Sequence, residues 1–74
     1  MTVLQLEATK KYGSLKKLAE RLSLTPGCLH QVNAGYRRAW PRLRQQVAAA
    51  LEMRDDELFD EKGWPREEEN YAND

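Results

Sequence analysis

The sequence predicts an all-α fold, with a compact domain of four to five short helices over residues 1–60 and a short acidic, poorly ordered tail over residues 61–74. Apolar residues recur at helical spacing in successive segments. Residues typical of helix ends separate these segments, and almost no segment alternates as a β-strand would. A chain of 74 residues allows one domain with a small core. We expect no enzymatic activity from a domain too small to form a substrate cleft.

The first two helices are predicted over residues 2–12 and 15–22. Thr2 followed three residues later by Gln5 has the form of a capping box. Ser14 is a good N-cap for the second segment. Four residues of that segment share one apolar face at spacings of three and four: Leu15, Leu18, Ala19 and Leu22.

A third helix is predicted over residues 26–34. Thr25 is placed to cap it, Pro26 suits its first position, and Gly35 is placed to end it. Only Ser23 to Thr25 separate the second helix from the third. Helices joined this tightly must cross at a large angle.

Two further helices complete the predicted domain. Pro41 can open the fourth, and Asp55 can cap a short fifth. Leu58 and Phe59 would return to the core. The apolar side of the fourth helix consists of Leu43, Val47, Ala50 and Leu51.

The net charge of zero hides a strong asymmetry. Residues 1–54 carry ten Lys and Arg against three Asp and Glu, a net charge of +7. Residues 55–74 carry two basic and nine acidic residues, a net charge of −7. A basic body favours a polyanionic partner. A solubilising tail on an ordinary basic domain explains the charge equally well.

Several chemistries are disfavoured. Cys28 is the only cysteine, so an intrachain disulfide and a structural zinc site are excluded, and we expect no metal or cofactor. Cys28 and His30 lie about 200° apart around a helix, which does not suit a nucleophile and its base. The sequence shows neither a membrane-spanning apolar stretch nor a signal peptide, so we expect a cytoplasmic protein.

The segment Ser14–Gly35 resembles the helix-turn-helix of lambda-repressor and Cro-type (XRE-like) DNA-binding domains. The features in register are Leu-Ala-Glu in the second helix, Leu-Thr-Pro at the turn, apolar Leu29 and Val32, and the final glycine. The later Val-Ala-Ala-Ala-Leu and Asp-Glu-Leu-Phe are also similar to the end of such domains, so the resemblance covers residues 2–60.

This resemblance implies a small phage or prokaryotic transcription regulator, such as a repressor, that binds double-stranded operator DNA. The helix at 26–34 would enter the major groove and the helix at 15–22 would lie across the backbone. Gln31 and Asn33 can pair with adenine, and His30 can donate to guanine or phosphate. The candidate base-reading residues, ranked with Gln31 first, are Gln31, His30, Asn33, Cys28 and Gly27.

Phosphate contacts and a dimer are expected around this helix. The candidate phosphate-binding residues are Ser14, Lys17, Thr25, Tyr36, Arg37, Arg38 and Arg42. A merely hydrated basic face is the alternative for each of them. One domain of this size makes few contacts, so we expect a homodimer on two half-sites. The candidate dimer contacts are Leu58, Phe59 and Trp64, although Trp64 could equally cover the core of one molecule.

Two points remain open at this stage. Ser23 stands where the family usually has glycine, because the turn needs a positive φ, so we expect Ser23 to be strained. The acidic tail also supports a second function, an antitoxin-like or adaptor module that binds a partner protein through that tail.

Overall fold

The computed structural model describes residues 1–68, and that part of the chain is mostly helical. Its helices are α1 (Val3–Tyr12), α2 (Leu15–Arg21), α3 (Pro26–Asn33), α4 (Pro41–Leu51) and α5 (Asp55–Leu58). Each predicted helix is present, with bounds within one residue of those expected for the first three. No helix in residues 1–68 is long and apolar enough to cross a membrane.

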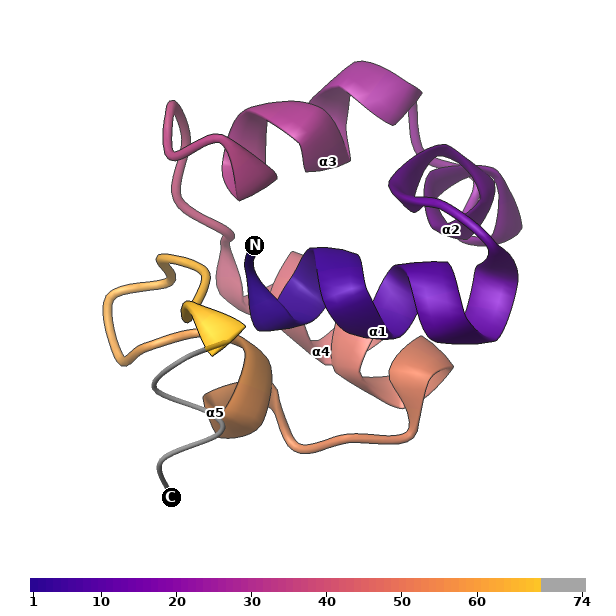
Figure 1. Ribbon diagram of the computed structural model, residues 1–74. Coiled ribbons are helices and arrows are strands. Elements are labelled where there is room, and N and C mark those ends of the chain that lie inside the picture. Colours follow the sequence, from indigo (N-terminus) through magenta and orange to yellow (C-terminus); the bar gives the residue numbers. More distant parts are fainter. Residues whose placement is uncertain (69–74) are drawn as a thin grey trace.

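The helices surround one core. Figure 1 shows α3 above α1, with α4 behind α1 and α5 at the end opposite α2. In the same view α2 lies nearly end-on while α3 runs across the page, so the two helices cross at the large angle expected of their short connection. The larger side chains at the centre of the core are Leu4, Leu18, Leu29, Val32, Leu43, Val47, Leu58 and Phe59, each at most 1% exposed.

Side-chain caps begin the first two helices. The Thr2 hydroxyl accepts a hydrogen bond from the Gln5 backbone N–H at 3.0 Å. The Ser14 hydroxyl accepts one from the Lys17 N–H at 3.1 Å. Both hydroxyls satisfy donors that have no partner inside the helix, so both predicted caps are confirmed.

Proline begins the third and fourth helices, and the predicted cap of the fifth helix is wrong. Pro26 and Pro41 occupy first positions, where a missing N–H is no loss. Thr25 is the N-cap residue of α3, as predicted, but its side chain makes no capping hydrogen bond. Asp55, the predicted cap, lies inside the first turn of α5, and Arg54 is the N-cap residue.

The turn between α2 and α3 is built as the sequence predicts. Ser23 has φ 59°, in the left-handed region that disfavours a side chain. The backbone closes around it through the Leu24 N–H, which donates to the Ala19 carbonyl at 2.8 Å. Ser23 is exposed, so no packing offsets the strain.

We expect the substitution Ser23→Gly to raise the melting temperature by about 2–6 °C. Relief of the left-handed strain gains about 1–2 kcal/mol, and the extra freedom of glycine in the unfolded chain cancels about 0.5–1 kcal/mol of that. Thermal unfolding followed by circular dichroism measures the shift. Ser23→Ala keeps the Cβ atom and should show no rise. An unchanged or lower melting temperature for Ser23→Gly would contradict the strain.

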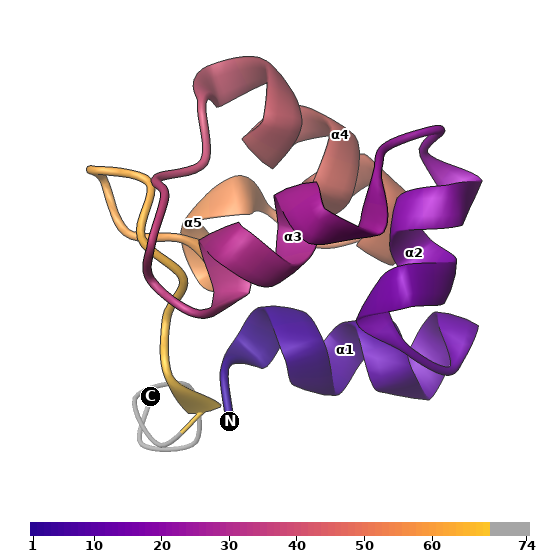
Figure 2. The same ribbon diagram turned by 90° about the horizontal axis from the view of Figure 1, so that it is seen from above.

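Residues 61–68 fold back onto the helices, so the predicted domain boundary at residue 60 is wrong for this segment. The Arg66 N–H donates to the Leu58 carbonyl at 2.9 Å, and the Arg66 carbonyl accepts from the Val3 N–H at 2.9 Å. Figure 2 shows the end of this segment beside the start of α1. The rest of the predicted tail, residues 69–74, lies outside the described residues.

Gly63 holds the returning segment against the loop before α4. It has φ 95°, and its carbonyl accepts a hydrogen bond from the Ala39 N–H at 2.9 Å. A Cβ atom built on Gly63 would lie 2.5 Å from the Ala39 carbonyl oxygen. Only glycine fits this position, for two reasons at once: its backbone conformation and the close approach of Ala39.

The Asp60 carboxylate organises the turn that carries Gly63. Its Oδ1 accepts hydrogen bonds from the backbone N–H groups of Trp64 and Lys62, each at 2.9 Å. The Trp64 N–H is the largest cause that lowers the pKa of Asp60 below its usual range. Donors that hold the ionised form favour it over the protonated form.

This pKa gives a prediction for the pH dependence of stability. Because the folded-state pKa of Asp60 is depressed, its contribution is complete above the unfolded pKa of about 4 and is lost as the pH falls through the folded pKa. We expect Asp60→Asn to lower the melting temperature at pH 7, with a difference from the native protein that shrinks below about pH 4. A constant difference for Asp60→Asn across this range would contradict the assignment.

Candidate nucleic-acid interface

The outward face of α3 carries small and polar residues. Gly27 lies three and four residues before His30 and Gln31, and Ala34, the C-cap residue, lies three residues after Gln31; all four are exposed. On the opposite side of the helix, Leu29 and Val32 are fully buried. A Cβ atom at Gly27 would meet nothing within 4 Å. The first turn of α3 is therefore unobstructed, with His30 and Gln31 one turn further along.

Three of the five predicted base-reading residues share this face: Gly27, His30 and Gln31. Cys28 is half-buried and packs against the core. Asn33 lies four residues after Leu29, on the side of the helix that faces the protein. The spacing from Leu29 already placed Asn33 on the inner side.

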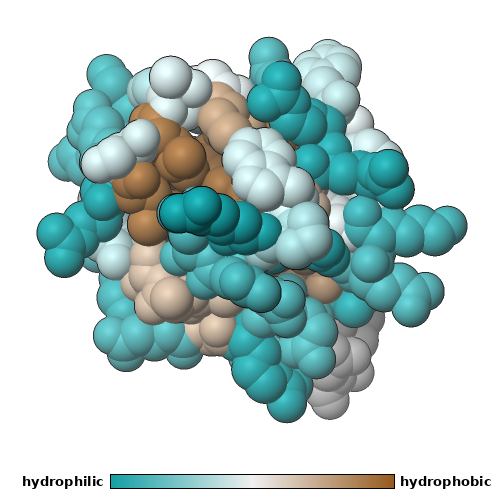
Figure 3. Space-filling model, turned by 180° about the vertical axis from the view of Figure 1, so that it is seen from behind, coloured by the Kyte–Doolittle hydropathy of each residue, from teal (hydrophilic) through white to brown (hydrophobic). Residues whose placement is uncertain are grey.

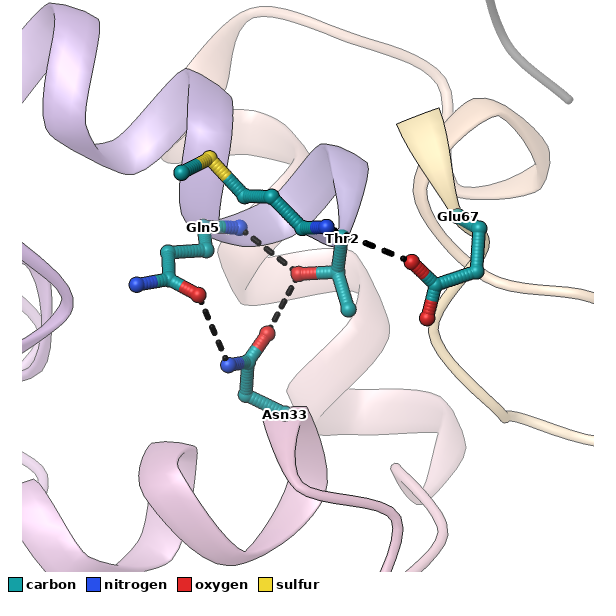
Figure 4. A network of polar contacts seen from close by, with 5 residues as sticks. Thr2, Gln5, Asn33 and Glu67 are labelled. Carbon is teal, nitrogen blue, oxygen red and sulfur yellow. Dashed lines mark hydrogen bonds and ion pairs between the residues drawn. The ribbon is translucent and has the colours of Figure 1, made fainter. Parts of the chain in front are cut away.

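Asn33 belongs to a partly buried polar network between α3 and the start of α1 (Figure 4). The Thr2 hydroxyl donates to the Asn33 Oδ1 atom. The Asn33 Nδ2 atom donates to the Gln5 Oε1 atom at 3.2 Å. The carboxamide is therefore used to tie the last turn of α3 to the first turn of α1, and the prediction that it reads bases does not fit this geometry.

Four predicted phosphate-binding cations are exposed and unpaired. Among residues 1–68, no ion pair includes Lys17, Arg37, Arg38 or Arg42. Tyr36, in the same loop as the first two arginines, is 84% exposed. Ser14 and Thr25 lie at the starts of α2 and α3, where free N–H groups favour anions.

Other basic residues already have acidic partners. Lys10 pairs with Glu7, and Arg54 pairs with Asp56 and Glu57. The Lys11 Nζ atom lies 2.8 Å from Glu52 and lowers the pKa of that carboxyl. Lys17, Arg37, Arg38 and Arg42 are thus distinct from these three neutralised cations.

The predicted dimer contacts are mostly unavailable. Leu58 is fully buried and Phe59 is 1% exposed, so both complete the core of one molecule. Their predicted return to the core is confirmed and their role in a dimer contact is wrong. Trp64 remains 36% exposed. Seen from behind, the molecule shows apolar side chains gathered at the upper left of the view (Figure 3).

Residues 1–68 contain no group of three His, Cys, Asp or Glu side chains that could hold a metal ion. Comparison of the chain with models of protein families, with curated proteins and with solved structures finds no match. The basis for a function is therefore the geometry and charge of the chain itself.

Proposed function

We propose that this chain is a DNA-binding transcription regulator in which α3 reads base edges in the major groove and α2 lies across the backbone. The observation that carries the proposal is the outward face of α3, on which Gly27, His30 and Gln31 are all exposed. The small residue in the first turn permits close approach to the groove. Gln31 can pair with adenine N6 and N7, and His30 can donate to guanine or phosphate.

The basic residues around α3 support the same function. Lys17, Arg37, Arg38 and Arg42 are free to neutralise backbone phosphates, which position a protein without reading sequence. A lambda-repressor-like domain in a prokaryotic cytoplasm is the setting proposed for this activity. A homodimer on half-sites about 34 Å apart is part of the proposal, and Trp64 is the one predicted contact that retains exposed surface.

The experiment begins with selection of bound duplexes from a random pool, followed by titration of the selected duplex at several salt concentrations. We expect the affinity to fall steeply with salt. Arg38→Ala should weaken binding to selected and unrelated duplexes alike, and should flatten the salt slope by about one. Arg54→Ala removes a cation that already pairs with acids and should have little effect. Binding without salt dependence, or equal effects of the two variants, would contradict the proposal.

The acidic end needs a separate experiment. A truncation that begins at residue 61 would remove the backbone pairing with α1 and destabilise the fold. Deletion of residues 69–74 alone is the informative variant, and we expect it to leave DNA binding intact. Loss of activity in the cell with intact DNA binding would favour an adaptor function for the acidic end.

A further inference from the structure

A basic cavity lies where three segments of the chain meet. The loop before α4, the first turns of α4 and the turn around Gly63 line a hollow of about 450 Å³ that is open to solvent. Its lining consists of Arg38, Ala39, Trp40, Pro41, Arg44 and Lys62. Three of these six residues are cationic and none is acidic, so the lining of this cavity is basic.

Arg44 has an unmet need for an acceptor. Its Nε atom is buried and has no hydrogen-bond partner in the described part of the chain. Arg44 also borders a second hollow that Asp55 and Asp60 help to line, yet no ion pair within residues 1–68 includes it. A buried donor without an acceptor is unfavourable. An anion in the basic cavity would place a negative charge beside this guanidinium and stabilise it.

The start of α4 adds further donors. Trp40 precedes the helix and makes no side-chain cap, and Pro41 has no N–H to offer. The next backbone N–H groups, of Arg42 and Leu43, lack partners inside the helix. An uncapped end of an eleven-residue helix attracts anions through these N–H groups and the helix dipole.

Lys62 is placed beside this helix end by the fold. The Asp60 carboxylate accepts the Lys62 N–H, and Gly63 packs directly on Ala39. A residue from the acidic segment 55–74 is thereby brought to the basic surface. Lys62 is distant from Arg38 and Arg44 in the sequence, but all three line the same cavity in the fold.

We infer that this cavity binds a phosphate group through Arg38, Arg44 and Lys62. This inference rests on the proposed function: the group is a backbone phosphate of bound DNA. Lys62 and Arg44 then extend the interface beyond the predicted contacts. A phosphate-bearing small molecule would offer the same chemistry, so the test must separate the two sources.

The first arm uses the free protein and inorganic phosphate. Titration monitored by ¹H–¹⁵N NMR, against chloride at matched ionic strength, should shift the Arg44 Nε–H signal and the amides of Arg42, Leu43 and Lys62. Lys62→Ala should reduce the shifts. Lys16→Ala, an exposed lysine of α2 that does not line the cavity, should leave them unchanged. Absence of phosphate-specific shifts would overturn the site.

The second arm uses the selected duplex. Lys62→Ala should weaken binding about five- to tenfold near 0.1 M salt and flatten the salt slope by about one, as expected for one lost phosphate contact. If native protein binds the duplex and Lys62→Ala binds equally well, the DNA contact is overturned while the proposed function stands. If phosphate shifts these signals but no duplex is bound, the proposed function fails and the cavity serves a phosphate-bearing small molecule.

Discussion

Replacing Gly63 by alanine is expected to cost about 2–5 kcal/mol of folding free energy. The left-handed conformation penalises a Cβ atom by about 1–2 kcal/mol, and forcing that atom against the Ala39 carbonyl adds about 1–3 kcal/mol of overpacking. The contact that must yield is with backbone, not with a flexible side chain. A domain of this size has a total stability of only about 4–11 kcal/mol, so the melting temperature should fall by at least about 10 °C.

Gly27→Ala is the matched control for this experiment. Gly27 is helical and faces open space, so its alanine variant should melt at the same temperature as the native protein or slightly higher. Circular dichroism melts of the two variants and the native protein give the comparison. If Gly63→Ala melts within a few degrees of the native protein, the contact with Ala39 does not constrain the fold.

Replacing Gln31 by glutamate is expected to reduce affinity for the selected duplex about 10- to 100-fold. The change removes an amide donor from the centre of the exposed face of α3, and a lost base contact costs about 1–3 kcal/mol. It also places a negative charge near the phosphates. Fluorescence anisotropy with labelled duplex at fixed salt measures the loss, and Gln31→Ala should show relaxed base preference without the added repulsion.

Gln46→Glu makes the same chemical change at another site. Gln46 lines a hollow bordered by residues of α1, α2 and α4 and by none of α3. Its glutamate variant should bind the duplex as the native protein does. Equal losses for Gln31→Glu and Gln46→Glu would mean that net charge, and not the α3 face, controls binding, which would contradict the proposed role of α3.

The helices could be predicted because their signals are local. Thr2 and Ser14 cap by hydrogen bonds to residues three positions away, and Pro26 and Pro41 act through their own ring geometry. The strain at Ser23 could be anticipated from the shortness of the turn. The exposed face of α3 followed from the burial of Leu29 and Val32, which leaves His30 and Gln31 on the outside.

The remaining features depend on contacts between distant segments. Residues 61–68 attach mainly through backbone groups, as in the hydrogen bond between Val3 and Arg66. Backbone hydrogen bonds do not depend on the type of side chain, so the acidic composition of this segment could not predict them. The partners of Asn33 lie 28 and 31 positions earlier in the chain, so only the folded structure identifies them.

The network around Asn33 has a consequence for recognition. One end of α3 is tethered to α1 through this carboxamide, and the other end follows directly from the tight turn after α2. A helix held at both ends is rigid before binding, and the entropy cost of ordering it is part of folding and not of binding. In the proposed complex the DNA duplex, and not α3, therefore changes its shape. Sites that differ only at base pairs untouched by any side chain should then differ in affinity, according to how readily each one bends or twists to meet the protein.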